Sequence, residues 1–139
     1  MSYDLMVLEP LSAPREPRAF FAWFKKVAEW GEPHSYDDPA FTTPTLRAWY
    51  HDMIKTLPAM NGPDASPNVD SDLITGYTCA STSIYCDFRW SRAEFAYDHV
   101  KTLARKHRLG FFDVSDTGDV WLPGKDGSYA VAFRAAGPG

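Results

Sequence analysis

The sequence has few cysteines, no long apolar run and little net charge, and each shortage excludes a class of protein. Two cysteines in 139 residues, Cys79 and Cys86, are too few to build a disulfide-stabilised scaffold. No run of about 18 apolar residues occurs, so no membrane-spanning helix is predicted. A formal net charge of -4 argues against nucleic-acid binding, because a phosphate-binding face is usually basic. We therefore expect neither nucleic acid nor membrane among the partners of this chain.

Signals for export and for common catalytic chemistries are also missing. The first residues, MSYDLMVLEP, lack the basic and long apolar regions of a signal peptide, so a cytoplasmic location with reduced thiols is predicted. The chain contains no G-x-S-x-G, no P-loop, no dinucleotide fingerprint and no H-E-x-x-H. We therefore assign no catalytic residue, no cofactor and no metal ligand from the sequence.

The composition is that of one folded domain. The chain is 45% hydrophobic and 15% aromatic, which is enough to build a sizeable core at this length. Residues 1–123 are predicted to form a single α+β domain. Residues 124–139 form a glycine-rich tail, and its alternating patch from Tyr129 to Phe133 leaves two alternatives, a mobile tail or an added edge strand.

Periodicity and turn signals predict the secondary structure in the order β-α-α-β-β-α-β-β. Strands are expected at 3–8, 73–79, 83–90, 111–114 and 120–122, and helices at 17–30, 43–57 and 91–109. The strand at 3–8 is apolar on both faces, as a central strand is. This order predicts an antiparallel sheet of four to five strands with three helices on one face, related to the ferredoxin-like (split βαβ) arrangement.

Three local patterns make sharper predictions. Thr43 before Pro44 predicts the start of the second helix. Ser91 to Glu94 matches a capping box, flanked by the apolar pair Trp90 and Phe95, and predicts the start of the third helix. A turn at residues 82–83 would place the two cysteines directly opposite each other on one buried face of a hairpin. A redox pair is the alternative, but C-x6-C is not a redox motif.

The stretch EPHSYDDPAFTTP, from Glu32 to Pro44, is the densest cluster of polar functional groups. His34 with Asp37 or Asp38 offers groups for metal binding or acid–base chemistry. The same residues are also typical of a turn, and the prolines stiffen it. We favour a connector or docking loop, and a metal or catalytic site is the alternative.

The predicted contact surface for a partner combines acidic loops with side chains expected on the outer face of the sheet. Trp121 is included because Val120 and Leu122 are expected on the inner face, although packing of the tail on Trp121 would explain it equally well. The full set is His34, Tyr36, Asp37, Asp38, Asp64, Asp70, Asp72, Tyr85, Arg89 and Trp121.

Four blocks carry a resemblance to a protein family. The blocks MSYDLMVLEP, HSYDDPAFTTPTLRAWYHDMI, PAMNGP and GFFDVSDTGDVWLPG resemble those of small, largely uncharacterised bacterial proteins that begin MSYDLMVF and end near a VWLP block. The resemblance covers residues 1–123. Such proteins are similar in size and style to immunity proteins, which are encoded beside secreted antibacterial toxins.

Two functions are therefore carried forward. The first is a non-catalytic protein-binding module, with immunity against a toxin as its specific form. The second is a small enzyme or small-ligand-binding protein with a pocket near the His34 loop. Homodimerisation through the outer face of the sheet is compatible with either.

Overall fold

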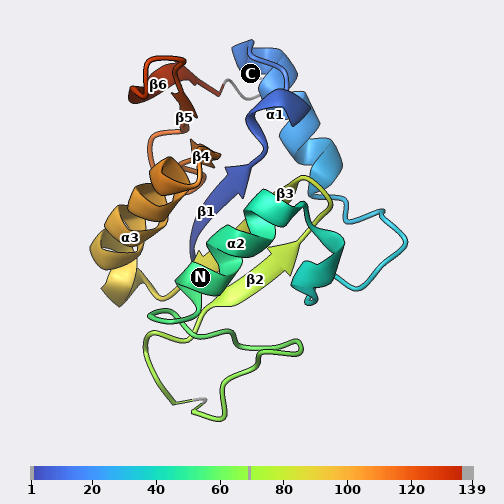
Figure 1. The fold of residues 1–139 in the computed structure, drawn as a ribbon, viewed down its shortest axis with the longest axis vertical. Helices are drawn as coiled ribbons and strands as arrows, with labels where there is room; N and C mark the ends of the chain where they lie inside the picture. The colour runs from blue at the N-terminus through green and yellow to red at the C-terminus, as the bar shows by residue number, and fades with distance from the viewer. Residues whose placement is uncertain (1, 69, 136–139) are drawn as a thin grey trace.

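The computed structural model describes residues 2–68 and 70–135, which form one six-stranded antiparallel sheet and three α-helices (Figure 1). The strands are β1 (Tyr3–Leu8), β2 (Gly76–Cys79), β3 (Ser83–Phe88), β4 (Gly110–Phe112), β5 (Asp119–Pro123) and β6 (Tyr129–Arg134). The α-helices are α1 (Pro17–Val27), α2 (Pro44–Met53) and α3 (Ala93–Lys106), and the 3-10 helices are η1 (Pro10–Ser12), η2 (Pro39–Phe41) and η3 (Trp90–Arg92). The predicted α+β class and antiparallel sheet are confirmed. None of the helices in the described ranges has the length and apolar character needed to cross a bilayer.

The sheet has the strand order β2-β3-β1-β4-β5-β6. β1 pairs with β3 on one side and β4 on the other, which confirms the predicted central strand. The sheet has six strands, not four to five, because the patch at Tyr129–Arg134 in the glycine-rich tail pairs with β5 as an edge strand. The tail therefore extends the sheet as far as it is described, and residues 136–139 lie outside the described residues.

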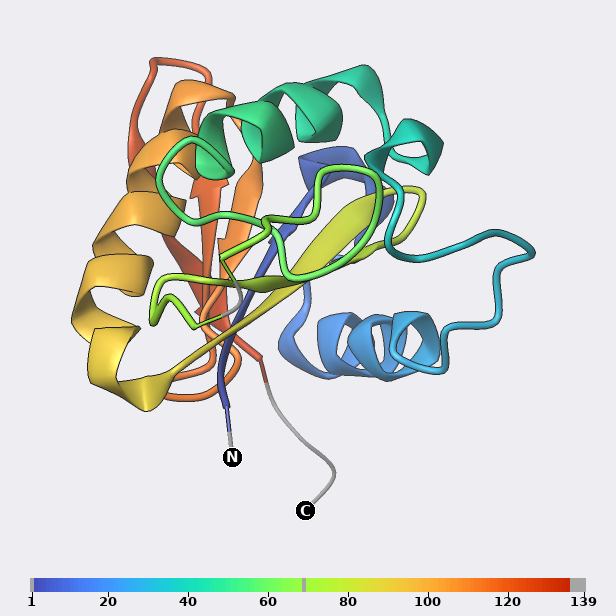
Figure 2. The same ribbon diagram turned by 90° about the horizontal axis from the view of Figure 1, so that it is seen from below.

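The helices cover both faces of the sheet, so the prediction of three helices on one face was wrong. On one face Leu5 and Val7 of β1 join the core that contains the buried residues of α2 and α3. On the other face Met6 and Leu8 pack with residues of α1. Figure 2 shows α1 on the side of β1 away from α2. The physical reason lies in β1 itself, because a strand that is apolar on both faces needs cover on both.

The start of α2 was predicted correctly and the start of α3 was not. The Thr43 hydroxyl accepts a hydrogen bond from the Leu46 amide at 3.2 Å, with Pro44 as the first helical residue. α3 begins only at Ala93, after the 3-10 turn η3, and no side chain caps it. Trp90 packs edge-on against Tyr3, with ring centroids 5.2 Å apart. The packing of Trp90 on Tyr3 is a tertiary contact, and it competes with the capping box that was predicted at Ser91.

Cys79 and Cys86 are both buried and unbonded on one face of the hairpin, as predicted, but they are not directly opposite. Cys79 pairs with Ile84, and Cys86 with Tyr77. The turn is at residues 81–82, one position before the predicted one, and that shift moves the pairing by two residues while preserving the face. Burial raises the pKa of the Cys79 thiol to about 12.

Candidate functional site

The stretch from Glu32 to Pro44 packs against an edge of the sheet. β2 is an edge strand, and the Cys79 amide donates a hydrogen bond of 2.6 Å to the Tyr36 carbonyl. The Tyr36 hydroxyl accepts a hydrogen bond of 2.5 Å from the Glu32 amide, which closes the loop on itself. The loop therefore satisfies part of the free edge of β2.

His34 forms a small hydrogen-bonded cluster in this loop. Its side chain is 10% exposed, with Nε2 2.5 Å from Oε1 of Glu32 and Nδ1 3.0 Å from the Ser35 carbonyl oxygen. The Glu32 carboxylate also accepts hydrogen bonds from the Ser81 amide at 3.0 Å and the Ser81 hydroxyl at 2.9 Å. Glu32 and His34 therefore fasten the loop to the turn between β2 and β3.

The surroundings of His34 favour its charged form. Both ring nitrogens lie beside oxygens that only accept, so both act as donors. The hydrogen bond to the Ser35 carbonyl, and then that to Glu32, raise the pKa of His34. Burial opposes ionisation of Glu32, but its bonds from His34 and Ser81 outweigh burial and lower its pKa.

The same cluster does not have the geometry of an activated nucleophile. The Ser81 hydroxyl donates to the Glu32 carboxylate and not to His34, so the serine–histidine hydrogen bond of a nucleophilic triad is not formed. No three His, Cys, Asp or Glu side chains within residues 2–68 and 70–135 gather closely enough to hold a metal ion.

Asp37 and Asp38 have local structural bonds. The Asp38 carboxylate accepts a hydrogen bond of 2.9 Å from the Ala40 amide and caps η2. The Asp37 carboxylate accepts from the Ser35 hydroxyl. The Asp37 carbonyl lies against Gly62, where a Cβ would overlap it. The contact between Asp37 and Gly62 joins the His34 loop to the loop that follows α2.

The other predicted aspartates differ in their surroundings. Asp64 accepts a hydrogen bond of 3.2 Å from the Tyr50 hydroxyl. Asp72 forms an ion pair of 2.7 Å with Arg92. Asp70 is exposed. Two of these three carboxylates are therefore engaged within the protein.

Tyr85 is not on a free outer face, because α1 covers that side of β3. Its ring stacks with Phe24 at 6.3 Å and meets Trp30 edge-on at 6.0 Å, and its hydroxyl donates to Asp4. Arg89, just beyond β3, is exposed. Trp30 also meets Tyr36 at 5.4 Å, so this indole lies between Tyr85 and the His34 loop.

Trp121 lies on the opposite face of the sheet and is partly buried. Its ring stacks with Tyr129 of β6 at 6.1 Å, and the Lys101 ammonium lies 3.3 Å from the ring centroid. The second sequence interpretation, packing by the tail, is the correct one. Trp121 is only partly exposed, because Tyr129 and Lys101 pack on its ring.

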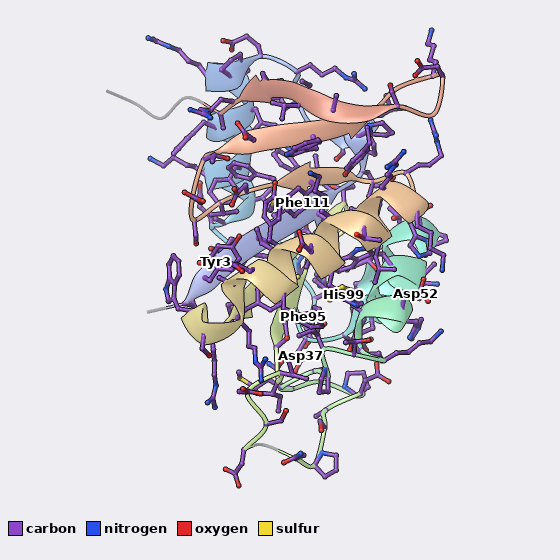
Figure 3. The ribbon with its side chains drawn as sticks, turned by 90° about the vertical axis from the view of Figure 1, so that its left-hand side faces the viewer. Tyr3, Asp37, Asp52, Phe95, His99 and Phe111 are labelled. Atoms are coloured by element: carbon purple, nitrogen blue, oxygen red, sulfur yellow. The ribbon has the colours of Figure 1, made fainter. Side chains whose placement is uncertain are left out.

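A cavity of about 450 Å³ lies between the first turns of α3, the beginning of β1 and the connection from β4 to β5. Figure 3 shows Tyr3 beside the N-terminal part of α3. The cavity is lined by Tyr3, Trp90, Ala93, Glu94, Tyr97, Asp98, Asp113, Asp116 and Thr117. We call it the acidic pocket, because its lining has four carboxylates and no basic side chain.

Asp113 is the buried member of this lining. It is 2% exposed, and its Oδ2 accepts hydrogen bonds from the Thr117 hydroxyl at 3.1 Å and the Thr117 amide at 3.4 Å. Its Oδ1 is buried and has no partner among the described residues. Burial raises the pKa of Asp113 against the bonds from Thr117, while Asp116 raises it through its charge and lowers it through its backbone amide. An unpartnered buried acceptor is costly unless a ligand or water satisfies it.

Aromatic rings form the rest of the wall. Tyr3 and Trp90 meet at 61° with centroids 5.2 Å apart, and Tyr97 is supported from the core by Phe111 at 5.3 Å. Trp90 is 48% exposed, and Phe95, one turn into α3, is 42% exposed. Exposed large apolar side chains therefore lie next to the acidic pocket.

No sequence signal pointed to this pocket. Tyr3 was interpreted only as part of a strand, Glu94 as a helix cap, and Asp116 as part of a hairpin turn. These residues come together because β1 pairs with β4, which places the start of β1 beside the connection that follows β4. The one local hint of an acidic site is that Glu94 and Asp98 lie four residues apart and therefore share one face of α3.

Comparison of the chain with protein-family models, with curated proteins and with solved structures gives no match.

Proposed function

We propose that the protein is a non-catalytic protein-binding module and that the acidic pocket is its contact site. The observation that supports this most is the lining of the pocket, which places three exposed carboxylates and no basic side chain around the buried carboxylate of Asp113. A site of this charge selects a basic group. A carboxylate that faces a basic partner speeds encounter and fixes register.

An anionic ligand at the start of α3 is disfavoured. The helix N-terminus carries the equivalent of about half a positive charge, which four carboxylates outweigh. The nearest base in the sequence, Arg92, is turned to Asp72 in an ion pair of 2.7 Å. Lys101 lies outside the lining, with its ammonium 5.4 Å from the Tyr97 ring centroid, so the four acids of the lining outnumber the bases near it.

A protein partner is favoured over a free small molecule because of Trp90 and Phe95. Trp90 packs on Tyr3 and Phe95 stacks on His99, yet each leaves close to half of its apolar surface exposed beside the pocket. Aromatic anchors around a charged pocket are typical of protein interfaces.

Several finer proposals follow from the sequence. The partner is a toxin that this chain neutralises as an immunity protein in a bacterial cytoplasm, as the resemblance implies. The interleaved strands β2-β3-β1-β4 are a ferredoxin-like unit, extended by β5 and β6. The ferredoxin-like proposal is supported by the strand order, in which β3 lies between β1 and β2, and β1 lies between β3 and β4, as in a split βαβ unit.

A second candidate function is a small-ligand-binding protein that uses the His34 loop. A cavity of about 350 Å³ is lined by residues at the end of α1 and by Glu32, the partner of His34. This observation favours a polar ligand near the Glu32–His34 pair.

The test compares variants that lose equal charge. The double variant Asp98→Asn/Asp116→Asn removes exposed acids from the pocket, and Asp37→Asn/Asp38→Asn removes two from the His34 loop. A partner is first captured with the wild-type protein from the source cells and identified, and its affinity for each variant is then measured by calorimetry at low and high salt. We expect the pocket variant to bind weakly and the loop variant to bind normally. Equal affinities of wild type and pocket variant would reject the pocket as the contact site.

The toxin proposal has a separate test. The product of a neighbouring gene is expressed with wild type, with the pocket variant or without either, and growth is measured. Immunity requires that wild type restores growth and that the pocket variant does so less well.

A further inference from the structure

We infer that the acidic pocket receives the guanidinium group of an arginine side chain of the partner, an assignment that rests on the proposed binding function. It adds the chemical identity of the group that the pocket selects. The arguments concern the size of the occupant, the number of its donors and the shape of the wall.

The occupant is larger than a metal ion. Four carboxylates line the pocket, yet no three of them within the described residues approach closely enough to coordinate one ion. Acids spread around a cavity of about 450 Å³ suit a group that reaches several of them at once.

The acceptors surround the cavity from two sides. Glu94 and Asp98 extend from α3, while Asp113 and Asp116 belong to the connection between β4 and β5. A guanidinium has five N–H donors in a fixed planar fork, whereas an ammonium has three. Asp113, whose buried Oδ1 has no partner among the described residues, is the innermost acid of this lining.

The depth of the site also favours guanidinium. Asp113 is fully buried, while Glu94, Asp98 and Asp116 are exposed, so the acidic lining runs from solvent into the protein. A guanidinium is more weakly hydrated than an ammonium and loses less when it leaves water for such a site.

The aromatic wall supplies flat surfaces. Tyr3 and Trp90 meet at 61°, and Tyr97 lines the same cavity. A planar cation stacks on such rings and gains cation–π attraction as well, most strongly on tryptophan. Trp90 is half exposed, so its face is accessible to an incoming side chain.

The experiment uses the intact protein and three small probes in NMR titrations. The probes are Nα-acetyl-arginine N-methylamide, the matching lysine compound and the matching citrulline compound, which has nearly the shape of arginine but no charge. The reporters are the Trp90 indole N–H and the Thr117 amide, both in the pocket lining.

We expect the arginine probe to shift both reporters and to bind several-fold more tightly than the lysine probe, and the citrulline probe to leave the reporters unshifted. Trp90→Leu should weaken arginine binding about 2- to 30-fold, the range of a cation–π contact. Asp116→Asn should also weaken it, whereas Asp70→Asn, an exposed acid outside the lining, should not.

The two levels of the proposal fail in different ways. Equal dissociation constants for the arginine and lysine probes would reject the guanidinium assignment and leave a general cation site. If neither cationic probe shifts the reporters while the variants keep their folded spectra, the acidic pocket is not a cation site, and the proposed function fails with it.

Discussion

Asp4 on β1 and Asp87 on β3 are direct partners in the sheet, so their carboxylates lie side by side on one face. Asp87 is partly buried, and its carboxylate lies over Gly76, where a Cβ would overlap it. Burial raises the pKa of Asp87, and the charge of Asp4 raises it further. Two like charges thus face each other on the central strands.

Asp87→Asn should therefore stabilise the protein near neutral pH. In the wild type, the folded protein binds the Asp87 proton more tightly than the unfolded chain does. The stability that this proton gives the wild type is complete below the ordinary pKa of a carboxyl group and is lost as pH rises through the raised pKa. At pH 7 we expect a gain of roughly 0.2–1 kcal/mol, the size of a cross-strand pair effect. Urea unfolding of both proteins across the acidic range should show the gain vanish at low pH, and a gain that grows on acidification would contradict the assignment.

Thr43→Ala and Ser91→Ala form a matched pair that tests where the helices begin. Thr43 caps α2 through the Leu46 amide, so its loss should cost about 0.5–2 kcal/mol. Ser91 lies in η3 before an uncapped α3, so its loss should change the free energy of unfolding very little. Denaturant midpoints with equal slopes measure both, and a large loss for Ser91→Ala would restore the capping box that the sequence suggested.

Gly62→Ala and Gly127→Ala separate backbone strain from steric overlap. Both glycines have positive φ, +86° and +84°, and an alanine in such a conformation costs roughly 1–2 kcal/mol. A Cβ at Gly127 meets nothing within 4 Å, whereas at Gly62 it overlaps the Asp37 carbonyl. Thermal unfolding should therefore show the larger loss for Gly62→Ala, and equal losses would mean that the two loops do not touch in solution.

His34→Ala should weaken the protein in a window of pH. The raised pKa of His34 contributes stability that is complete below the ordinary pKa of histidine and lost as pH rises through the raised one. The lowered pKa of Glu32 contributes stability above its ordinary value and loses it as pH falls. The difference between wild type and variant should be greatest between the ordinary pKa values of the two groups.

Chemical denaturation at several pH values measures this difference, with His51→Ala, an exposed histidine on α2, as the control. A difference for His34→Ala that stays constant into alkaline pH would show that the charge of His34 contributes nothing.

Local patterns predicted those features that depend on neighbouring residues. The strand Tyr3–Leu8 and the helix start at Thr43 were predicted with the correct boundaries, since alternation and capping act over a few residues. The turn between β2 and β3 was misplaced by one residue, because Ser81, Thr82 and Ser83 are similar in turn preference. The start of α3 was missed because Trp90 packs on Tyr3, far away in the sequence.

By itself the sequence determined the α+β class, the central strand, two buried thiols and the lack of common catalytic motifs. Only the tertiary structure decided which face each helix covers, that the tail becomes β6, and that Tyr85 and Trp121 are covered on opposite faces. It alone also formed the acidic pocket, whose acids Asp98 and Asp113 come from separate elements. The physical reason is that periodicity shows which side of an element is apolar, whereas the partner of that side is chosen by strand pairing over the whole chain.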